Sequence, residues 1–360
     1  MERKLVTIRK ITNIKKIPKY DRILSANVDN WYVIINVKDK FQEDDLCVFF
    51  EIDSVLPKDD ERFEFLSRSN WRIKTMKMAG TISEGLALPL SVLPEGTEVK
   101  LGMDVTDIMK VTKYDPYIKN PNLNVPPDPT NKLTDTFKRI LGIEADRNFP
   151  SFVKKTDLNR VQNVFHRMEN KTGFVVTEKL DGSSATYALK LHKLFGIIPY
   201  YNVSVWSRNV SQSIHNPRSV WGIVFKKLKM RRKLIELFKL SGAEETCAIQ
   251  GEIIGRSIQG NKYNLTVPAK FYGYGITIDS IPINPFRYFE ELKLETVPVL
   301  KTDVDITNST SEELLKLAGG KSKLNINTLR EGVVYKRYEY NEEVSRFKIV
   351  DRNFLMEYGE

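Results

Sequence analysis

A lysine that closely follows an apolar strand is the residue of this chain best placed for chemistry. Lys179 comes after the apolar run GFVV, which ends at Val176, and stands two residues before the dipeptide Asp181-Gly182. A strand fixes its backbone and an Asp-Gly turn bends the chain back, so the amine of Lys179 should lie at the rim of any pocket that the sheet supports. A lysine in that place is a candidate nucleophile. The run also fits a surface lysine beside a hairpin turn, so the residues that follow must decide between the two.

Five further segments downstream each combine a short apolar strand with charged or aromatic residues. In chain order they are WSRN (206–209), AIQGEIIG (248–255), KFYGYGI (270–276), REGVVYK (330–336) and SRFKIV (345–350). Together they add carboxylates, an aromatic platform and further cations to the lysine. These are the parts needed for covalent nucleotidyl transfer, in which a lysine amine attacks the α-phosphorus of a nucleoside triphosphate.

That attack requires a neutral amine, whereas a lysine with its ordinary pKa of about 10.4 is almost wholly protonated at neutral pH. We therefore expect the pKa of Lys179 to be lowered by a bound divalent cation, by neighbouring lysines and by partial burial. Lys336 and Lys348 would neutralise the charge that builds up on the α-phosphate. The candidates to hold Mg²⁺ or Mn²⁺, directly or through its waters, are three carboxylates: Asp181, Glu252 and Glu331.

The elements that must position these residues fall into two regions of different pattern. Residues 1–112 show short apolar strands broken by turns with Lys, Asp, Gly and Pro, which predicts a small β-barrel. Residues 113–140 are rich in proline and asparagine and are typical of a linker. Residues 141–360 interleave strands and helices without a strict βαβ repeat. We therefore predict an α+β protein whose larger domain has antiparallel sheets flanked by helices.

Two predicted helices lie close to these boundaries. The segment KLTDTFKRILGI, residues 132–143, is helix-like. After it, Thr156 or Asp157 could cap a helix that carries Leu158, Val161 and Val164 on one side.

Composition limits the protein class. The 360 residues are 41% hydrophobic, which is normal for packed globular domains, and the apolar runs are too short for a membrane span. Cys47 and Cys247 are too few and too far apart for a disulfide framework or a zinc site. We expect a soluble, intracellular protein. The formal charge of +10 favours a polyanionic partner, and the densest basic cluster, residues 226–233, is either a solvated helix face or a phosphate-contacting surface.

At these motifs the chain resembles the covalent nucleotidyltransferases, the superfamily of RNA ligases, DNA ligases and mRNA capping enzymes. KLDG resembles its motif I, SRN its motif Ia and QGE its motif III. EGVVYK resembles motif IV, and RFK resembles motif V, in which K-x-K is usual. The aromatic stretch resembles motif IIIa, where Tyr274 would stack on the purine and Tyr272 is the second choice.

The resemblance implies roles for individual residues. It makes Lys179 the adenylated residue and implies catalytic parts for Glu252, Lys336 and Lys348. It also implies a nucleotide-binding set: Glu178, Lys179, Arg208, Asn209, Glu252, Tyr274, Glu331, Lys336 and Lys348.

The order of the domains indicates which group of this superfamily the chain resembles. In DNA ligases and capping enzymes a small OB-fold domain follows the catalytic one, but here the chain ends shortly after Lys348 and a barrel-like domain comes first. The whole resembles RNA ligase family five, whose N-terminal module is OB-like and whose catalytic domain is an ATP-grasp-like ligase fold. By that analogy Arg160 and Gln162 border the nucleotide site.

The resemblance implies an ATP-dependent RNA ligase that joins 3′-OH and 5′-phosphate ends through lysyl-AMP and an adenylylated RNA 5′-phosphate, as in RNA repair. We expect ATP and Mg²⁺ or Mn²⁺ as cofactors. The expected partner is RNA, in a nicked duplex with RNA at the 3′-OH side, and we expect a monomer with no membrane partner. Two alternatives are a guanylyltransferase that uses GTP for capping and a catalytically silent RNA-binding relative.

Overall fold

A computed structural model describes residues 3–114, 148–194, 197–208, 210–214 and 219–358. Most of the predicted linker, the predicted helix at 132–143 and Asn209 lie outside these ranges.

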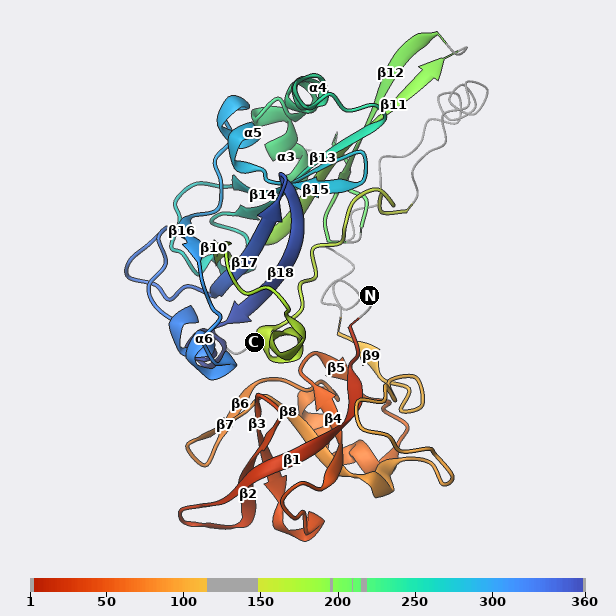
Figure 1. The fold of residues 1–360 in the computed structure, drawn as a ribbon, viewed down its shortest axis with the longest axis vertical. Coiled ribbons are helices and arrows are strands. Elements are labelled where there is room, and N and C mark those ends of the chain that lie inside the picture. The colour runs from red at the N-terminus through yellow and green to blue at the C-terminus, as the bar shows by residue number, and fades with distance from the viewer. Residues whose placement is uncertain (1–2, 115–147, 195–196, 209, 215–218, 359–360) are drawn as a thin grey trace.

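The N-terminal region is a curled antiparallel half-barrel with strand order β3-β2-β1-β4-β8 (Figure 1). Its strands are β1 (Val6–Ile17), β2 (Tyr20–Val28), β3 (Trp31–Asn36), β4 (Leu46–Glu51) and β8 (Gly85–Pro89). The first half of β1 pairs with β4 and the second half with β2, with a register shift between Thr12 and Lys15. Asn13 has a φ of 56° at this shift, and such a bulge bends a strand so that one sheet can curl around its core.

Short elements complete this region. Two small antiparallel pairs join β5 (Ser54–Val55) to β9 (Thr112–Lys113) and β6 (Met76–Met78) to β7 (Thr81–Ser83). The 3₁₀ helices are η1 (Val37–Asp39), η2 (Glu61–Ser69) and η3 (Leu90–Val92). Four aromatic residues fill the core and are fully buried: Trp31, Phe49, Phe50 and Phe63. The short apolar strands that the sequence predicted thus share one hydrophobic core.

The C-terminal region contains a nine-stranded sheet in the order β12-β11-β13-β14-β15-β18-β17-β10-β16, and its paired strands are antiparallel. Its strands are β10 (Phe174–Lys179), β11 (Ser183–Leu194), β12 (Ile198–Trp206), β13 (Thr246–Ile254), β14 (Lys270–Ile278), β15 (Ile281–Ile283), β16 (Val299–Val304), β17 (Gly332–Glu339) and β18 (Glu342–Val350). The short strand β15 pairs with β18 only through Ile283 and Glu342. This narrow join divides the sheet into two halves, one on each side of β15.

Helices cover each half of the large sheet (Figure 1). Helices α3 (Val220–Lys227), α4 (Met230–Ser241) and α5 (Phe286–Glu291) share a core with β11, β13 and β14. Helices α2 (Val161–Val164) and α6 (Ser311–Ala318) share another with β10, β17 and β18. The remaining helical segments are η5 (Phe165–Arg167), η6 (Gln259–Asn261) and α7 (Arg352–Tyr358). The α+β fold and its antiparallel sheets therefore match the sequence prediction.

The helix α2 begins later than the sequence predicted. It starts at Val161, and its N-cap residue, Arg160, makes no side-chain cap. The prediction that Thr156 or Asp157 caps this helix is wrong, because the preceding residues run beside β18 instead. The Lys348 N–H donates to the Asn159 carbonyl at 2.9 Å, and Arg160 forms a parallel bridge with Lys348.

Helix α2 also contacts the N-terminal region. Asn163 Nδ2 donates to Glu51 Oε1 at 2.8 Å, while Asn163 Oδ1 accepts from Arg9 and from Trp31 Nε1, each at 3.3 Å. A second contact between the regions comes from α7, where Arg352 donates to the buried carboxylate of Glu84 at 2.7 Å. The two regions are therefore held together by polar side chains that reach their partners across the interface.

The basic cluster of residues 226–233 spans the junction of α3 and α4. Lys229 has a φ of 52° and ends the first helix before the second begins. Met230, Leu234, Leu237 and Phe238 form the buried face of α4, while most cations of the cluster are exposed. In the described part of the chain no helix is long and apolar enough to cross a membrane.

Candidate active site

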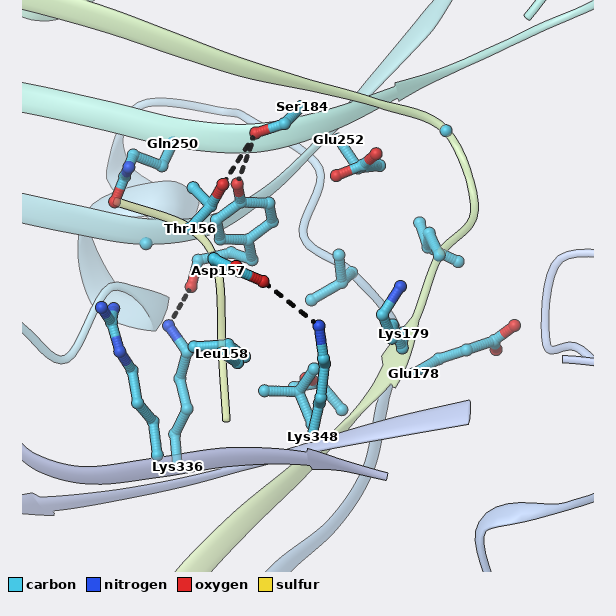
Figure 2. A pocket seen from close by; sticks show the side chains of 18 of the residues that line it. Thr156, Asp157, Leu158, Glu178, Lys179, Ser184, Gln250, Glu252, Lys336 and Lys348 are labelled. Atoms are coloured by element: carbon cyan, nitrogen blue, oxygen red, sulfur yellow. Dashed lines mark hydrogen bonds and ion pairs between the residues drawn. The ribbon is translucent and has the colours of Figure 1, made fainter. Parts of the chain in front are cut away.

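A cavity of about 250 Å³ lies between the two halves of the large sheet (Figure 2). Side chains from β10, β11, β13, β14, β17 and β18 line it, together with the segment 156–158 that precedes α2. Six separate sequence motifs converge here because antiparallel pairing places β10 beside β17 and β11 beside β13. Most of the predicted site residues therefore share one cavity.

Lys179 is the last residue of β10 and pairs with Gly332 of β17. The bend that follows is tightly packed, since a Cβ on Gly182 would lie 2.5 Å from the Ile253 carbonyl oxygen. The backbone N–H of Asp181 donates to the hydroxyl of Tyr263 at 2.7 Å. Lys179 thus ends a strand and lines the cavity, as the sequence predicted, but the chain only bends at Gly182 and then crosses to β11 in the other half of the sheet.

The amine of Lys179 forms an ion pair with Glu331 Oε1. Burial acts to lower the pKa of Lys179, but Glu331, with Glu252 and Asp181 behind it, raises the pKa above its ordinary value. The pKa of Lys179 is therefore raised, not lowered, while its amine contacts Glu331; the predicted lowering included the effect of a bound divalent cation and stays a prediction. The physical reason for the raised pKa is that the carboxylate contacts the amine directly, which favours the charged form.

The three predicted metal-binding carboxylates have different surroundings. Asp181 pairs with Lys262 at 2.7 Å, whereas Glu331 Oε2 is buried and has no hydrogen-bond partner in the residues that the structure describes. Burial, together with the charges of Glu331 and Asp181, raises the pKa of Glu252 to about 8 although Lys179 acts to lower it. Carboxylates that crowd one another in this way would be stabilised by a divalent cation.

The donor set therefore fits Mg²⁺ or Mn²⁺, which prefer oxygen ligands and retain some of their waters. Among the described residues, no three His, Cys, Asp or Glu side chains are already arranged as a complete cage. A metal here would be held by one or two carboxylates, by water and by substrate oxygens, which is the usual mode for magnesium at phosphates.

Lys336 lies at the far end of the cavity and is fully paired. Its amine donates to the Tyr274 carbonyl and pairs with Glu343, each at 2.9 Å. Burial lowers the pKa of Lys336 although Glu343 acts to raise it. Arg346, the motif V residue in place of the usual lysine, pairs with the same carboxylate at 3.2 Å.

Lys348 and Arg208 lie nearer to Lys179. Lys348 Nζ is 3.4 Å from Asp157 Oδ1, and Arg208 Nη2 is 3.3 Å from Asp157 Oδ2. Burial lowers the pKa of Lys348 well below its ordinary value, and the nearby cations Lys179 and Arg160 lower it further. Basic side chains are thus concentrated where a phosphate chain would lie, and an anion there would favour the charged form of Lys348.

The two tyrosines predicted to stack on the base, Tyr274 and Tyr272, differ in their position relative to the cavity. Tyr274 lines the cavity, and its hydroxyl lies 3.1 Å from Ser184 Oγ. Tyr272 is buried with Tyr263 and Val297, in a cluster against which Tyr274 also packs, and it is not part of the cavity lining. The geometry therefore favours Tyr274 as the residue against which a base could stack.

Glu178 contributes less to the cavity than the motif implied. Its carboxylate accepts hydrogen bonds from Ser322 Oγ at 2.5 Å and from the Lys323 N–H at 2.8 Å (Figure 2 shows the side chain turned from Lys179). Glu178 lines the cavity, and these bonds also tie it to the loop that leads to Glu331.

A second cavity, of about 330 Å³, lies between the N-terminal region and the large sheet. It shares Lys179, Asp181 and Lys348 with the first cavity. Its other cations include Arg3, Arg72, Lys74, Lys113 and Arg160. Arg160 thus borders this second space, whereas Gln162 is buried and lines neither cavity.

Sequence reasoning missed three residues that pair with the predicted set: Asp157, Lys262 and Glu343. Asp157 stood in a capping pattern that suggested another role, and Glu343 lies three residues before Arg346 at a hairpin end. Lys262 belongs to the loop between β13 and β14, and its amine lies 5.0 Å from the Phe354 ring centroid and 5.4 Å from that of Tyr358. No local pattern marks such a residue, because its partners come from distant segments.

Comparisons with known proteins agree with this geometry. A family model described as RNA ligase matches residues 172–350, and one described as an OB-fold domain matches residues 5–90. The solved structure of Naegleria gruberi RNA ligase with PPi is 32% identical, with a TM-score of 0.76, and the match covers 98% of each chain. A mutant of that ligase with ATP and Mn is 31% identical, with a TM-score of 0.75 and the same coverage. The comparison with curated proteins found no match.

Proposed function

The chain belongs to the RNA ligase family and is an ATP-dependent RNA ligase with an N-terminal OB-fold domain, and we propose that it joins 3′-OH and 5′-phosphate RNA ends through a lysyl-AMP intermediate on Lys179. The observation that carries this proposal is the convergence, in one cavity, of a strand-end lysine, carboxylates and phosphate-side cations. We take residues 1–112 as the OB-like domain, 113–140 as the linker and 141–360 as the adenylation domain.

ATP and Mg²⁺ or Mn²⁺ are the cofactors of this proposal, in keeping with the ATP and Mn in a similar ligase structure. Asp181, Glu252 and Glu331 would hold the metal directly or through water. When bound, the metal would supply positive charge that stabilises the phosphate oxygens during transfer.

In the first step, Lys179 separates from Glu331, loses its proton and attacks the α-phosphorus of ATP. A phosphorus–nitrogen bond forms, the bond to the bridging oxygen breaks and pyrophosphate leaves. Tyr274 would stack on the base, while Lys336, Lys348 and Arg208 would neutralise the developing negative charge. Asn209, which the motif adds to this set, lies outside the described residues.

In the second step, an oxygen of the RNA 5′-phosphate attacks the same phosphorus and the bond to Lys179 breaks. In the third, the 3′-OH of the neighbouring strand attacks the RNA 5′-phosphate, which forms the phosphodiester and releases AMP. Lys179, which leaves as an amine, is then ready for another ATP.

We propose a nicked duplex with RNA at the 3′-OH side as substrate, a monomeric enzyme and an intracellular location. The formal charge of +10 supports a nucleic-acid partner. The two cysteines are buried and unpaired, which supports a reducing compartment.

The test is covalent labelling with ATP that carries a radioactive α-phosphate. The wild type with Mg²⁺ should become labelled and should pass the label to a 5′-phosphorylated nick, whereas Lys179→Ala should not become labelled. GTP labelled in the same way should not replace ATP. Equal labelling of the Lys179→Ala variant would exclude this lysine as the nucleophile.

A further inference from the structure

Three cations from separate parts of the chain converge on one carboxylate, that of Asp157. Lys113, at the end of β9 in the N-terminal region, forms an ion pair with Asp157 Oδ2. Arg208 contacts the same oxygen at 3.3 Å, and Lys348 contacts Oδ1 at 3.4 Å, as Figure 2 shows for Lys348. An arginine and two lysines around two anionic oxygens form the kind of environment that also binds a phosphate group.

The position of Asp157 also resembles that of a bound phosphate. Asp157 lines both cavities, as do Lys179, Arg208 and Lys348. It therefore lies at the junction of the space where the nucleoside would bind and the cationic space between the two regions. Any phosphate that joins these spaces must pass the cations that now hold Asp157.

The local charge makes the Asp157 carboxylate and an incoming phosphate compete for the same cations. Lys348 is half-buried, and Lys179, Arg160 and Arg208 all lie near enough to oppose its positive charge. A carboxylate relieves this repulsion when no phosphate is present. With a phosphate bound, the same carboxylate would repel it and would occupy the donors that the phosphate needs.

The backbone around Asp157 would allow its side chain to rotate away from the cations. The segment is anchored after Asp157, where Asn159 accepts from the Lys348 N–H and Asn163 bonds to the N-terminal region. Asp157 itself precedes α2 and is not part of a helix. A rotation of its side chain, with no movement of these anchors, would release the three cations.

We propose that Asp157 is an internal substitute for a phosphate group: its carboxylate holds Lys113, Arg208 and Lys348 together in the ligand-free enzyme and is displaced when a phosphate enters. The phosphate belongs either to ATP or to the 5′ end of RNA. The inference rests on the proposed function for the identity of these ligands. Asp157 is thus a positioning residue, which keeps the cations assembled but lowers their affinity for the incoming phosphate.

The direct test measures the binding of inorganic pyrophosphate to the full-length protein by calorimetry. Asp157→Asn keeps the shape of the side chain and removes its charge, so it should bind pyrophosphate about tenfold more tightly than the wild type, which corresponds to about 1.4 kcal/mol. Asp157→Glu keeps the charge and should bind like the wild type. Glu291→Gln, on α5, makes the same change in net charge beside Arg287 and should also bind like the wild type.

Thermal unfolding is measured alongside, and Asp157→Ser replaces the Asn variant if that variant is unfolded. A folded variant without the charge that binds pyrophosphate equally or more weakly would overturn the proposal. The proposal would also be overturned if Glu291→Gln tightened pyrophosphate binding as much as Asp157→Asn, because the change in net charge alone would then explain the effect.

Two kinetic arms identify the source of the phosphate. A fall in the KM for ATP during self-labelling of Asp157→Asn assigns the site to the ATP phosphates. A fall in the KM for a 5′-phosphorylated nick, measured with enzyme already carrying AMP, assigns it to RNA. If neither the KM for ATP nor the KM for the nick falls, the proposal is contradicted. Pyrophosphate binding requires no catalysis, so a wild type that fails to become labelled would refute the proposed function without deciding this inference.

Discussion

The two ends of the nucleotide cavity hold their lysines in different ways. At the end near Tyr274, Lys336 has both a carbonyl and the Glu343 carboxylate as partners at 2.9 Å, and the Tyr274 hydroxyl is bonded to Ser184. At the other end, Lys179 is paired with Glu331, one of whose oxygens has no hydrogen-bond partner in the described residues.

This difference indicates two kinds of site. The Lys336 end has its polar groups satisfied before any ligand arrives, so it is a fixed part of the fold. At the Lys179 end, the proposed mechanism requires the ion pair of Lys179 with Glu331 to open when ATP binds. Substitutions that break the Lys336–Glu343 pair should therefore affect mainly stability, and those at the Lys179 end mainly activity.

The largest expected effect is at Glu331. Glu331→Gln should lower self-labelling on the order of a hundredfold or more, because it removes a charge that would hold the metal near the α-phosphate. Its midpoint of thermal unfolding should stay within about 2–4 °C of the wild type, since Gln can still accept from Lys179. Quenched-flow labelling and calorimetry measure the two quantities. A large loss of stability would remove the contrast between the two ends.

At the opposite end, Glu343→Gln should lower the free energy of unfolding by about 3 kcal/mol, because it leaves the buried amine of Lys336 without its counter-charge. Denaturant unfolding measures this directly. Glu312→Gln, which changes an exposed i,i+4 pair on α6, is the matched control and should change stability by less than about 0.5 kcal/mol. Equal effects from the two substitutions would show that the Lys336 pair is not a structural element.

The aromatic platform gives a smaller effect that is specific to the ligand. Tyr274→Leu should raise the KM for ATP about tenfold, because stacking on a base contributes about 1–3 kcal/mol. Tyr272→Leu is the control for a buried tyrosine of the same strand and should lower stability with little change in this KM. A larger KM effect for Tyr272 would exchange the roles assigned to the two residues.

The smallest effect concerns the cationic space between the two regions. Burial acts to raise the pKa of Asp53, but Arg72, Arg3 and Arg160 lower it to about 2. A carboxyl whose pKa is lowered by folding stabilises the protein above its ordinary pKa, and this stabilisation is lost as the pH falls through the folded value. The wild type should therefore lose stability between about pH 4 and pH 2. Asp53→Asn should lose less over that range in pH-dependent unfolding, and an unchanged slope would contradict the assignment.

Much of the fold followed from local patterns. Short apolar strands broken by turns predicted a small β-barrel, which the structure shows as a curled half-barrel, and the interleaved strands and helices predicted the antiparallel α+β region. The start of α2 was not predictable in the same way. Asp157 has the residue type of a helix cap, but the pairing of its segment with β18 and its contact with distant cations prevailed over that local preference.

The candidate nucleophile, Lys179, could be proposed from its motif, but its charge state could not. The spacing of K-x-D-G and the order of the later motifs predicted a nucleophile, carboxylates and cations on strand ends. The pKa of Lys179 depends instead on Glu331, which is 152 positions away along the chain. A pKa is set by atoms within a few ångströms, and sequence spacing does not report such distances.

The sequence by itself therefore determined which residue types this ligase uses and which strands carry them, because motifs and apolar periodicity are local properties of the chain. Only the tertiary structure decided which charges meet. Lys179 meets Glu331, Asp181 meets Lys262, and Asp157 meets cations from three segments. Electrostatic pairing depends on distance in space, and the fold brings together residues that lie from 44 to 191 positions apart along the chain.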